Sequence, residues 1–279
     1  MGSRDFDPAG SPLRVFGAEL RHYRVCAGLS QEQLGARLYC SSDLVGKVEN
    51  GQRAPTPEFT AACDAVTELD TRGALGRLRE HLQDHLRYRV YPGWFQDWPN
   101  KEAEAKTLRW FEPLVVPGLL QTEEYARALL RTRVGDTDDQ IEDMVAARME
   151  RQVVVSREKP PTLWVIIDEG VLRRPVGGPA VMGGQVRHLI EAAQRPNIVL
   201  QVIPLSVGAH EGLRGPFVIA DFEAAPSVVY VDTTVRGQVV EQGDDIDAVR
   251  VTWDTLMAEA LSRKASVDLA EEVVKTSWT

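Results

Sequence analysis

Short apolar stripes separated by helix caps fill the first quarter of the chain. The first stripe recurs at steps of three and four residues, which predicts a helix with one apolar face. It consists of Leu13, Phe16, Leu20, Tyr23 and Ala27. Gly28 follows at the position where a left-handed residue commonly ends a helix, so we expect the helix to stop there.

A second helix is predicted to begin after Ser30. Ser30 and Gln33 have the spacing of a capping box, in which each side chain bonds the backbone N–H of the other residue. Leu29 and Leu34 occupy the two positions of a hydrophobic staple, which sets the angle at which the chain enters the helix. The small Gly35 and Ala36 would let another helix approach closely.

A third helix is predicted to begin at Ser42 or Asp43, with Ser41 as its N-cap and Gly51 at its end. Its inner face carries two Val residues, at positions 45 and 48. Its other face is narrow, flat and polar, and consists of Ser42, Asp43, Gly46, Lys47 and Asn50. Gly inside a helix costs about 1 kcal/mol relative to Ala, whereas a flat polar face suits the major groove of DNA. The alternative is a solvated face with an incidental Gly, and helix geometry alone leaves both interpretations open.

Residues 56–75 complete a helical bundle. Thr56 caps a fourth helix that starts at Pro57. Its predicted buried stripe is Phe59, Cys63, Val66 and Leu69. We therefore predict an all-α domain over residues 13–75, preceded by a disordered polar tail over residues 1–12 and followed by a connector helix over residues 76–90.

Strand and helix patterns alternate along residues 91–279, which predicts an α+β or mixed α/β domain. Strands are predicted over residues 162–168, 197–205, 217–222, 227–233 and 236–242. A helix over residues 183–194 separates the first two, which could therefore be parallel. Short turns make the last three antiparallel. Further helices are predicted after Thr122, over residues 138–157 and over residues 245–263.

Composition excludes several classes of protein. The sequence has no secretory signal and no apolar run long enough to span a membrane, and its three Cys residues have no paired or metal-binding spacing. We expect a cytoplasmic protein without a metal site or a cofactor. The net charge of −9 argues against a general nucleic-acid coat protein, yet residues 13–55 carry a charge of +2. A protein that binds a specific DNA sequence through a small surface remains consistent with these charges.

The segment LSQEQLGARLYCSSDLVGKVENGQRAP, residues 29–55, resembles the helix-turn-helix of phage-repressor-like (Xre-type) transcription factors. The resemblance implies that base edges are approached by Ser42, Asp43, Gly46 and Lys47. It implies that the DNA backbone is contacted by Gln31, Ser41, Asn50 and Arg53.

Two residues of this segment need a separate interpretation. The family usually has Gly in the turn where this chain has Tyr39, and Tyr tolerates a positive φ poorly. Glu49 is expected to bind within the protein, to Arg21, Arg24 or Arg37, because a carboxylate beside phosphate is repelled.

The C-terminal region resembles the uncharacterised C-terminal domain of WhiJ-like actinobacterial regulators. The resemblance covers residues 88–263 and is carried by stretches such as WFQDWPNKEAEAKTLRWFEPLVVPGLLQTEEYARALL and GAHEGLRGPFVIADF. It implies a cytoplasmic transcriptional regulator that is often accompanied by a small partner protein and is described as antitoxin-like.

Candidate chemistry in the C-terminal region is sparse. Asp168 and Glu169 are adjacent in sequence at a strand end, where side chains point in opposite directions, so they are not a facing pair. A candidate effector or partner pocket is formed by Trp94, Trp98, Trp110, His210 and Arg214. The structural alternative is that the Trp residues are core and the Gly-rich loop is inert. No nucleophile or acid–base constellation is recognisable, so no catalytic residue is predicted.

Three functions follow from these patterns. The first is a sequence-specific DNA-binding regulator that binds a duplex operator as a homodimer, since one short recognition helix reads few base pairs. Its C-terminal domain would dimerise and bind a partner protein or a small effector. The second is an antitoxin-like protein that neutralises a small partner protein. The third is an enzyme that acts on a phosphorylated metabolite and that the helical domain directs to DNA.

Overall fold

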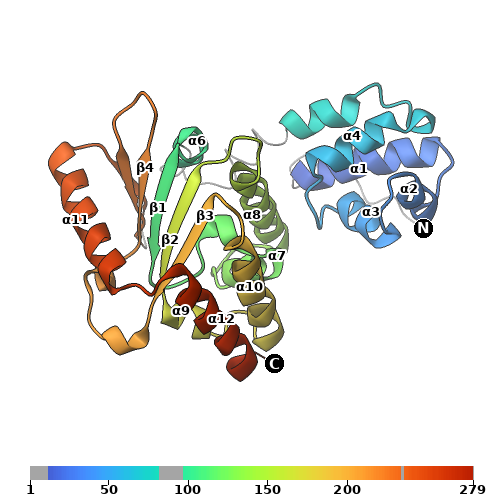
Figure 1. Ribbon diagram of the computed structural model, residues 1–279. Helices are drawn as coiled ribbons and strands as arrows, with labels where there is room; N and C mark the ends of the chain where they lie inside the picture. The colour runs from blue at the N-terminus through green and yellow to red at the C-terminus, as the bar shows by residue number, and fades with distance from the viewer. Residues whose placement is uncertain (1–11, 82–96, 234–235, 279) are drawn as a thin grey trace. The chain divides into compact units, whose positions relative to one another are not determined.

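The computed structural model describes residues 12–81, 97–233 and 236–278. The chain divides into two compact units (Figure 1). The first comprises residues 1–92 and 133–150, and the second comprises residues 93–132 and 151–279. The multidomain fold predicted from the sequence, with helices first and a mixed sheet afterwards, is confirmed. Within the described ranges, no helix is both long and apolar enough to cross a membrane.

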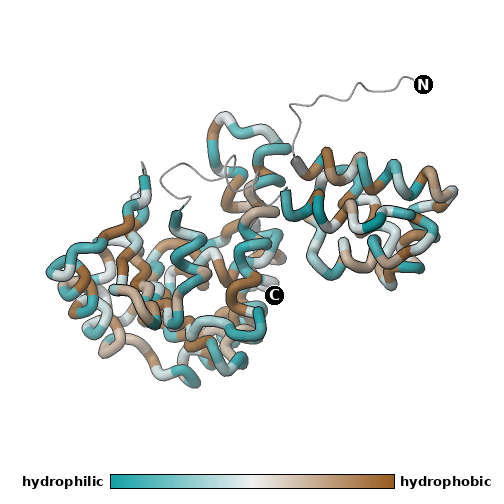
Figure 2. The backbone as a smooth tube through the Cα atoms, turned by 90° about the horizontal axis from the view of Figure 1, so that it is seen from above, coloured by the Kyte–Doolittle hydropathy of each residue, from teal (hydrophilic) through white to brown (hydrophobic). Residues whose placement is uncertain are grey.

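The first unit begins with three helices whose caps follow the sequence signals. They are α1 (Pro12–Cys26), α2 (Gln31–Arg37) and α3 (Ser42–Glu49). Ser30 and Gln33 form the predicted capping box, and the Ser41 hydroxyl accepts a hydrogen bond from the Leu44 N–H at 3.1 Å. Hydrophobic and hydrophilic residues alternate along these helices (Figure 2), and the hydrophobic ones meet in a shared core.

The fourth helix is shorter than its apolar stripe. Helix α4 (Pro57–Ala65) is capped by Thr56, as predicted, but Leu69 lies on a 3-10 turn, η1 (Thr67–Leu69). The Asp64 carboxylate then accepts hydrogen bonds from the Thr71 hydroxyl and from the Leu75 N–H. These contacts hold the start of a helical segment over residues 74–81. The remainder of the predicted connector helix lies outside the described residues, as does the tail over residues 1–11.

One helix from the middle of the chain also belongs to the first unit. Helix α8 (Asp138–Arg151) is shorter than predicted, because a 3-10 turn, η3 (Gln152–Val155), follows it. Its Ala146 and Ala147 pack with Leu13 of α1 and with Ala54. Its Asp139 accepts a hydrogen bond from Arg14 at 2.7 Å.

The described residues of the second unit contain a six-stranded sheet with the order β3-β2-β1-β4-β5-β6. Its parallel part consists of β1 (Thr107–Glu112), β2 (Thr162–Asp168) and β3 (Ile198–Ile203). Its antiparallel part adds β4 (Phe217–Asp221), β5 (Val228–Val231) and β6 (Gln238–Val240). The predicted pairing directions are therefore confirmed for all five predicted strands.

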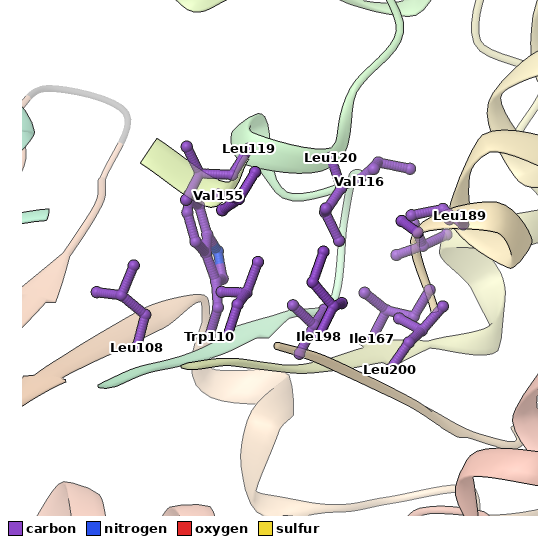
Figure 3. Packing of buried hydrophobic residues seen from close by; sticks show 14 of the residues in the cluster. Leu108, Trp110, Val116, Leu119, Leu120, Val155, Ile167, Leu189, Ile198 and Leu200 are labelled. Atoms are coloured by element: carbon purple, nitrogen blue, oxygen red, sulfur yellow. The ribbon is translucent and has the colours of Figure 1, made fainter. Parts of the chain in front are cut away.

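The sheet has an apolar core on each face. On one face lie α6 (Trp98–Glu104), η2 (Gly118–Leu120), α7 (Glu123–Leu130), α9 (Glu169–Arg173), α10 (Pro179–Ala192) and α12 (Arg263–Ser277). Figure 3 shows Trp110, Ile167 and Leu200 rising from the strands of this face toward Leu119, Leu120 and Leu189. On the other face lies α11 (Gly243–Glu259), which contributes Trp253 and Leu256 to a separate cluster (Figure 1).

The central strand β1 is the main element that the sequence analysis missed. Its sequence, TLRWFE, lies in the Trp-rich segment and buries Trp110 on one face and Phe111 on the other. Polar and apolar residues alternate only from Thr107 to Trp110, and Phe111 breaks the pattern because it is buried on the covered second face of the sheet. The short helices α6 and α9 and the final helix α12 were also not predicted.

Candidate nucleic-acid interface

Helix α3 presents two sharply different faces. Val45 and Val48 are fully buried in the core of the first unit, as predicted. Ser42, Asp43 and Lys47 on the other face are exposed to solvent. The short helix therefore offers a polar surface that is backed by a rigid apolar core.

Two glycines allow α3 to lie very close to its neighbours. A Cβ atom on Gly17 of α1 would lie 2.4 Å from the carbonyl oxygen of Glu49. A Cβ atom on Gly35 of α2 would lie 2.8 Å from the carbonyl oxygen of Cys40 in the turn and 3.2 Å from the backbone nitrogen of Ser42, the first residue of α3. Both contacts are with backbone atoms, so a larger residue at either site would displace α3. The predicted close approach is confirmed at Gly35, whereas Ala36 is exposed to solvent.

Gly46 has a neighbour that the sequence analysis did not anticipate. A Cβ atom at this position would lie 3.4 Å from the Gln31 Oε1 atom and 3.7 Å from its Nε2 atom. The amide of Gln31 thus packs beside Gly46, at the point where the start of α2 meets α3. A Cβ atom at these distances would make only ordinary van der Waals contacts with the amide, so Gly46 keeps the surface flat but is not required to make room for Gln31.

Glu49, the last residue of α3, contacts side chains from both α1 and α2. Its side chain is completely buried. Arg24 of α1 donates to both of its oxygens, at 2.5 and 3.0 Å, and Gln31 donates to Oε2 at 2.8 Å. The Arg21 Nε atom lies 3.5 Å from the Glu49 Oε2 atom. The prediction that Glu49 binds within the protein is confirmed for Arg21 and Arg24, whereas Arg37 pairs with Glu68 instead.

These contacts set the ionisation of Glu49. Burial raises the pKa of the carboxyl, but the hydrogen bonds from Arg24 and Gln31, together with the positive charges, outweigh burial and leave the pKa below its usual value. The pKa of Arg24 is raised in turn by its hydrogen bond to Glu49. A charged network therefore ties α1, α2 and α3 together behind the polar surface.

The exposed residues of α3 carry balanced charges. Lys47 and Asp43 form an ion pair of 2.9 Å, one turn apart on the helix. Asn50, beyond the end of α3, accepts a hydrogen bond from Arg21 at 2.6 Å. Arg53 is also exposed. Arg21 was expected from the sequence only as a partner of Glu49, and its spacing of three from Arg24 on α1 puts both cations on one helix face.

The turn between α2 and α3 contains Tyr39 in an unusual conformation. Its φ angle is 54°, in the region that glycine adopts easily and a bulky residue does not. The following residue, Cys40, donates its N–H to the Gly35 carbonyl at 2.9 Å. The conformation expected for glycine at this position is therefore present with Tyr in its place.

The second candidate site, in the C-terminal region, is divided by the sheet. Trp98 and Trp110 are buried in the core of one face, and Trp98 stacks on Tyr230 with ring centroids 4.7 Å apart. His210 lies on the opposite face, against the ring of Phe111. Arg214 is exposed and pairs with Glu211. Trp94 lies outside the described residues. The four described members do not line one pocket.

The Gly-rich loop around His210 has structural contacts of its own. The His210 side chain is buried and lies 3.3 Å from the Asp168 carboxylate. Asp168 also caps α9, whereas Glu169 lies on that helix and accepts a hydrogen bond from the Leu205 N–H. A Cβ atom on Gly212 would overlap the ring of Phe111. Close packing on the sheet therefore explains part of the glycine content of this loop.

One buried carboxylate was not predicted from the sequence. Glu102 of α6 is completely buried, and its Oε1 atom lies 3.1 Å from the Nε atom of Arg151. Burial raises the pKa of Glu102, and the charge of Arg151 opposes that effect. Only the charge of this residue was visible in the sequence, since its neighbour Arg151 is forty-nine positions away.

Two family models match the chain. The model described as Helix-turn-helix domain matches residues 15–82. The model described as Domain of unknown function (DUF5753) matches residues 95–272. No curated protein and no solved structure matches. The helix-turn-helix match indicates DNA binding by the N-terminal helices. Since the second match covers more than half of the sequence, the chain belongs to the family of proteins that carry the DUF5753 domain.

Proposed function

We propose that the protein is a sequence-specific transcriptional regulator that reads duplex DNA with the exposed face of α3. The observation that carries the proposal is the contrast between the two sides of this helix. The outer side is polar and free of bulky residues at Ser42 and Gly46, and the inner side is held by the buried Arg24–Glu49 pair. A helix held in this way can enter a major groove without rearranging.

In this proposal Ser42, Asp43 and Lys47 meet base edges, while Gly46 lets the helix lie deep in the groove. Lys47 would exchange its ion pair with Asp43 for a base or phosphate oxygen. The carboxylate of Asp43 could then accept from a cytosine amino group. Because the pair is exposed, breaking it costs little.

The DNA backbone is proposed to be contacted at both ends of this surface. Asn50 and Arg53 lie just beyond the end of α3 and are exposed. Ser41 and Gln31 lie at the starts of α3 and α2, where helix N-termini favour anions. Since the Gln31 side chain donates to Glu49, its contact with phosphate would come through the N-terminal N–H groups of α2.

We propose that the regulator acts as a homodimer whose DUF5753 domain binds a partner protein or a small effector. Two recognition helices would read two half-sites about one helical turn apart. The resemblance to WhiJ-like regulators supports a small partner protein and an antitoxin-like role. The proposal assigns no catalytic step, since His210 is buried against Phe111 and paired with Asp168.

Selection of duplexes from a random library by the full-length protein, followed by binding measurements, tests the proposal. The Lys47→Ala and Ser42→Ala variants should each bind the selected duplex about tenfold more weakly, since a good base contact is worth about 1–3 kcal/mol. Lys264→Ala removes an exposed cation of α12 in the second unit and is the charge-matched control. Failure to select any common sequence, or unchanged binding of both α3 variants, would refute the assignment.

A further inference from the structure

We infer that the side chain of Tyr39 binds the DNA backbone at the wall of the groove that α3 enters, with its hydroxyl donating to a phosphate oxygen. The inference rests on the proposed function and adds a residue that the family resemblance does not assign to DNA. Three features of Tyr39 support it, namely its backbone conformation, the exposure of its ring and its place in the chain.

The backbone of Tyr39 favours a different residue. Tyr39 follows Leu38, the C-cap of α2, with φ at 54°. The N–H of Cys40 reaches back to the Gly35 carbonyl, which is the hydrogen bond of a Schellman motif. Glycine is the usual residue at this point of the motif, and a residue with a Cβ atom costs about 1–2 kcal/mol in the left-handed region.

The ring of Tyr39 does not offset that cost within the fold. The residue is 97% exposed, more than the other large hydrophobic residues of the helix-turn-helix. Across residues 12–81, 97–233 and 236–278, the Tyr39 side chain makes no hydrogen bond and no ring contact and joins no apolar cluster. Within the part of the chain that the structure describes, folding therefore gains nothing from the ring, and glycine should make the isolated protein more stable. We attribute the ring to a contact outside the chain.

The position of Tyr39 selects DNA as that contact. Tyr39 precedes Ser42, the first residue of α3, by three positions, which span at most about 11 Å. The major groove is about 12 Å wide. When Ser42 lies at base edges within the groove, Tyr39 therefore lies near its wall of deoxyribose and phosphate. Tyr is among the side chains that donate to phosphate oxygens, and its ring can pack on the apolar sugar.

The test uses the full-length protein and the tightest duplex that the wild type selects from a random library. Tyr39→Gly should raise the melting temperature by about 4 °C, because it removes about 1 kcal/mol of strain. The same variant should weaken binding of the duplex about tenfold, which corresponds to about 1.4 kcal/mol. A side chain with a merely structural role would shift stability and affinity in the same direction.

Two further variants locate the contact. Tyr39→Phe keeps the ring and removes the donor, so it should weaken binding about threefold without changing the salt dependence, since one neutral hydrogen bond contributes about 0.5–1.5 kcal/mol. Val25→Ala trims another exposed apolar side chain, on α1, and should bind as the wild type does.

The outcomes separate this inference from the proposed function. If the wild type selects no duplex, the proposed function fails and the inference fails with it. If Lys47→Ala weakens binding while Tyr39→Gly binds as tightly as the wild type, the reading surface stands and the inference about Tyr39 is overturned. Wild-type affinity of Tyr39→Phe, or a lower melting temperature of Tyr39→Gly, overturns it as well.

Discussion

Arg24 and Glu49 form a buried, two-pronged ion pair across twenty-five positions of sequence, with nitrogen–oxygen distances of 2.5 and 3.0 Å. The pair joins the first helix of the chain to the last residue of the helix proposed to read DNA. Gln31 adds a third donor from the start of α2. The orientation of the proposed reading surface thus depends on one carboxylate that solvent does not reach.

Glu49→Gln should destabilise the first unit strongly. The substitution leaves Arg24 buried without its anion, and breaking a buried ion pair from one side costs about 3–5 kcal/mol. Urea unfolding followed by circular dichroism would measure the loss. Glu68→Gln is the matched control, because Glu68 pairs with Arg37 at the surface and its loss should leave the midpoint nearly unchanged. Equal effects of the two variants would contradict the role given to the buried pair.

The same carboxyl predicts a response to acid. The pKa of Glu49 is lower in the folded chain than its usual value, so its contribution to stability is complete above the pKa of the unfolded state. That contribution is lost as the pH falls through the folded pKa. Unfolding midpoints of wild type and Glu49→Gln should therefore converge as the solution is acidified below about pH 4, near the usual carboxyl range. A constant gap between them at all pH values would count against this linkage.

Glu112, at the end of β1, predicts the opposite dependence. Burial raises the pKa of its carboxyl to about 7, so the folded chain keeps a proton that the unfolded chain has released. The contribution of Glu112 to the free energy of unfolding is fully present below the pKa of the unfolded state, and it is lost as the pH rises through 7. Glu112→Gln should therefore be more stable than the wild type at pH 8 by an amount on the order of 1–3 kcal/mol, with little difference in mild acid. Denaturant unfolding at pH 8 and in mild acid measures the difference in stability between the two proteins. A wild type that gained stability relative to Glu112→Gln from mild acid to pH 8 would refute the prediction.

Gly17→Ala should displace α3 from α1. The new Cβ atom would lie 2.4 Å from the backbone oxygen of Glu49, and overpacking of this kind costs about 1–3 kcal/mol. DNA binding should weaken together with stability, since the shift moves the reading surface. Gly184→Ala on α10 is the control, because its Cβ atom would meet nothing within 4 Å and the change should be neutral or stabilising. Thermal melts of both variants measure the difference, and an equally stable Gly17→Ala protein would show that the helices can separate without cost.

The three cysteines should react in a fixed order. Cys26 is exposed, Cys40 is partly buried and Cys63 is buried. Burial raises the pKa of Cys63 to about 12, and burial also raises the pKa of Cys40, so both hold less reactive thiolate. A thiol reagent at pH 8 should modify Cys26 first, and Cys63 only after denaturation. Peptide mapping by mass spectrometry identifies the modified residues, and early modification of Cys63 would contradict its place in the core.

The helix-turn-helix could be predicted from sequence because its signals are local. The capping box at Ser30, the N-cap at Ser41 and the Val pair at 45 and 48 lie within one or two turns of the residues that they position. That Glu49 binds within the protein also followed from electrostatics, since a carboxylate beside phosphate is repelled, but the sequence left its partner open among Arg21, Arg24 and Arg37. Strand directions in the sheet followed from connection lengths.

The candidate pocket could not be predicted in the same way. Trp110 and Phe111 are neighbours in sequence, but a strand sends them to opposite faces of the sheet. Trp98 was paired in sequence reasoning with His210, which the sheet separates from it. A cluster of aromatic residues along the chain carries no information about which face each one occupies, until the strand that contains them is recognised.

The sequence by itself determined the class of fold and the register of helix α3. These properties depend on neighbours a few positions apart, where caps, staples and φ preferences act. Only the tertiary structure decided the central strand β1, the burial of Glu102 beside Arg151 and the packing of Gln31 against Gly46. Those contacts join residues that are distant along the chain, and their energies come from burial and from distances that exist only after the elements have packed.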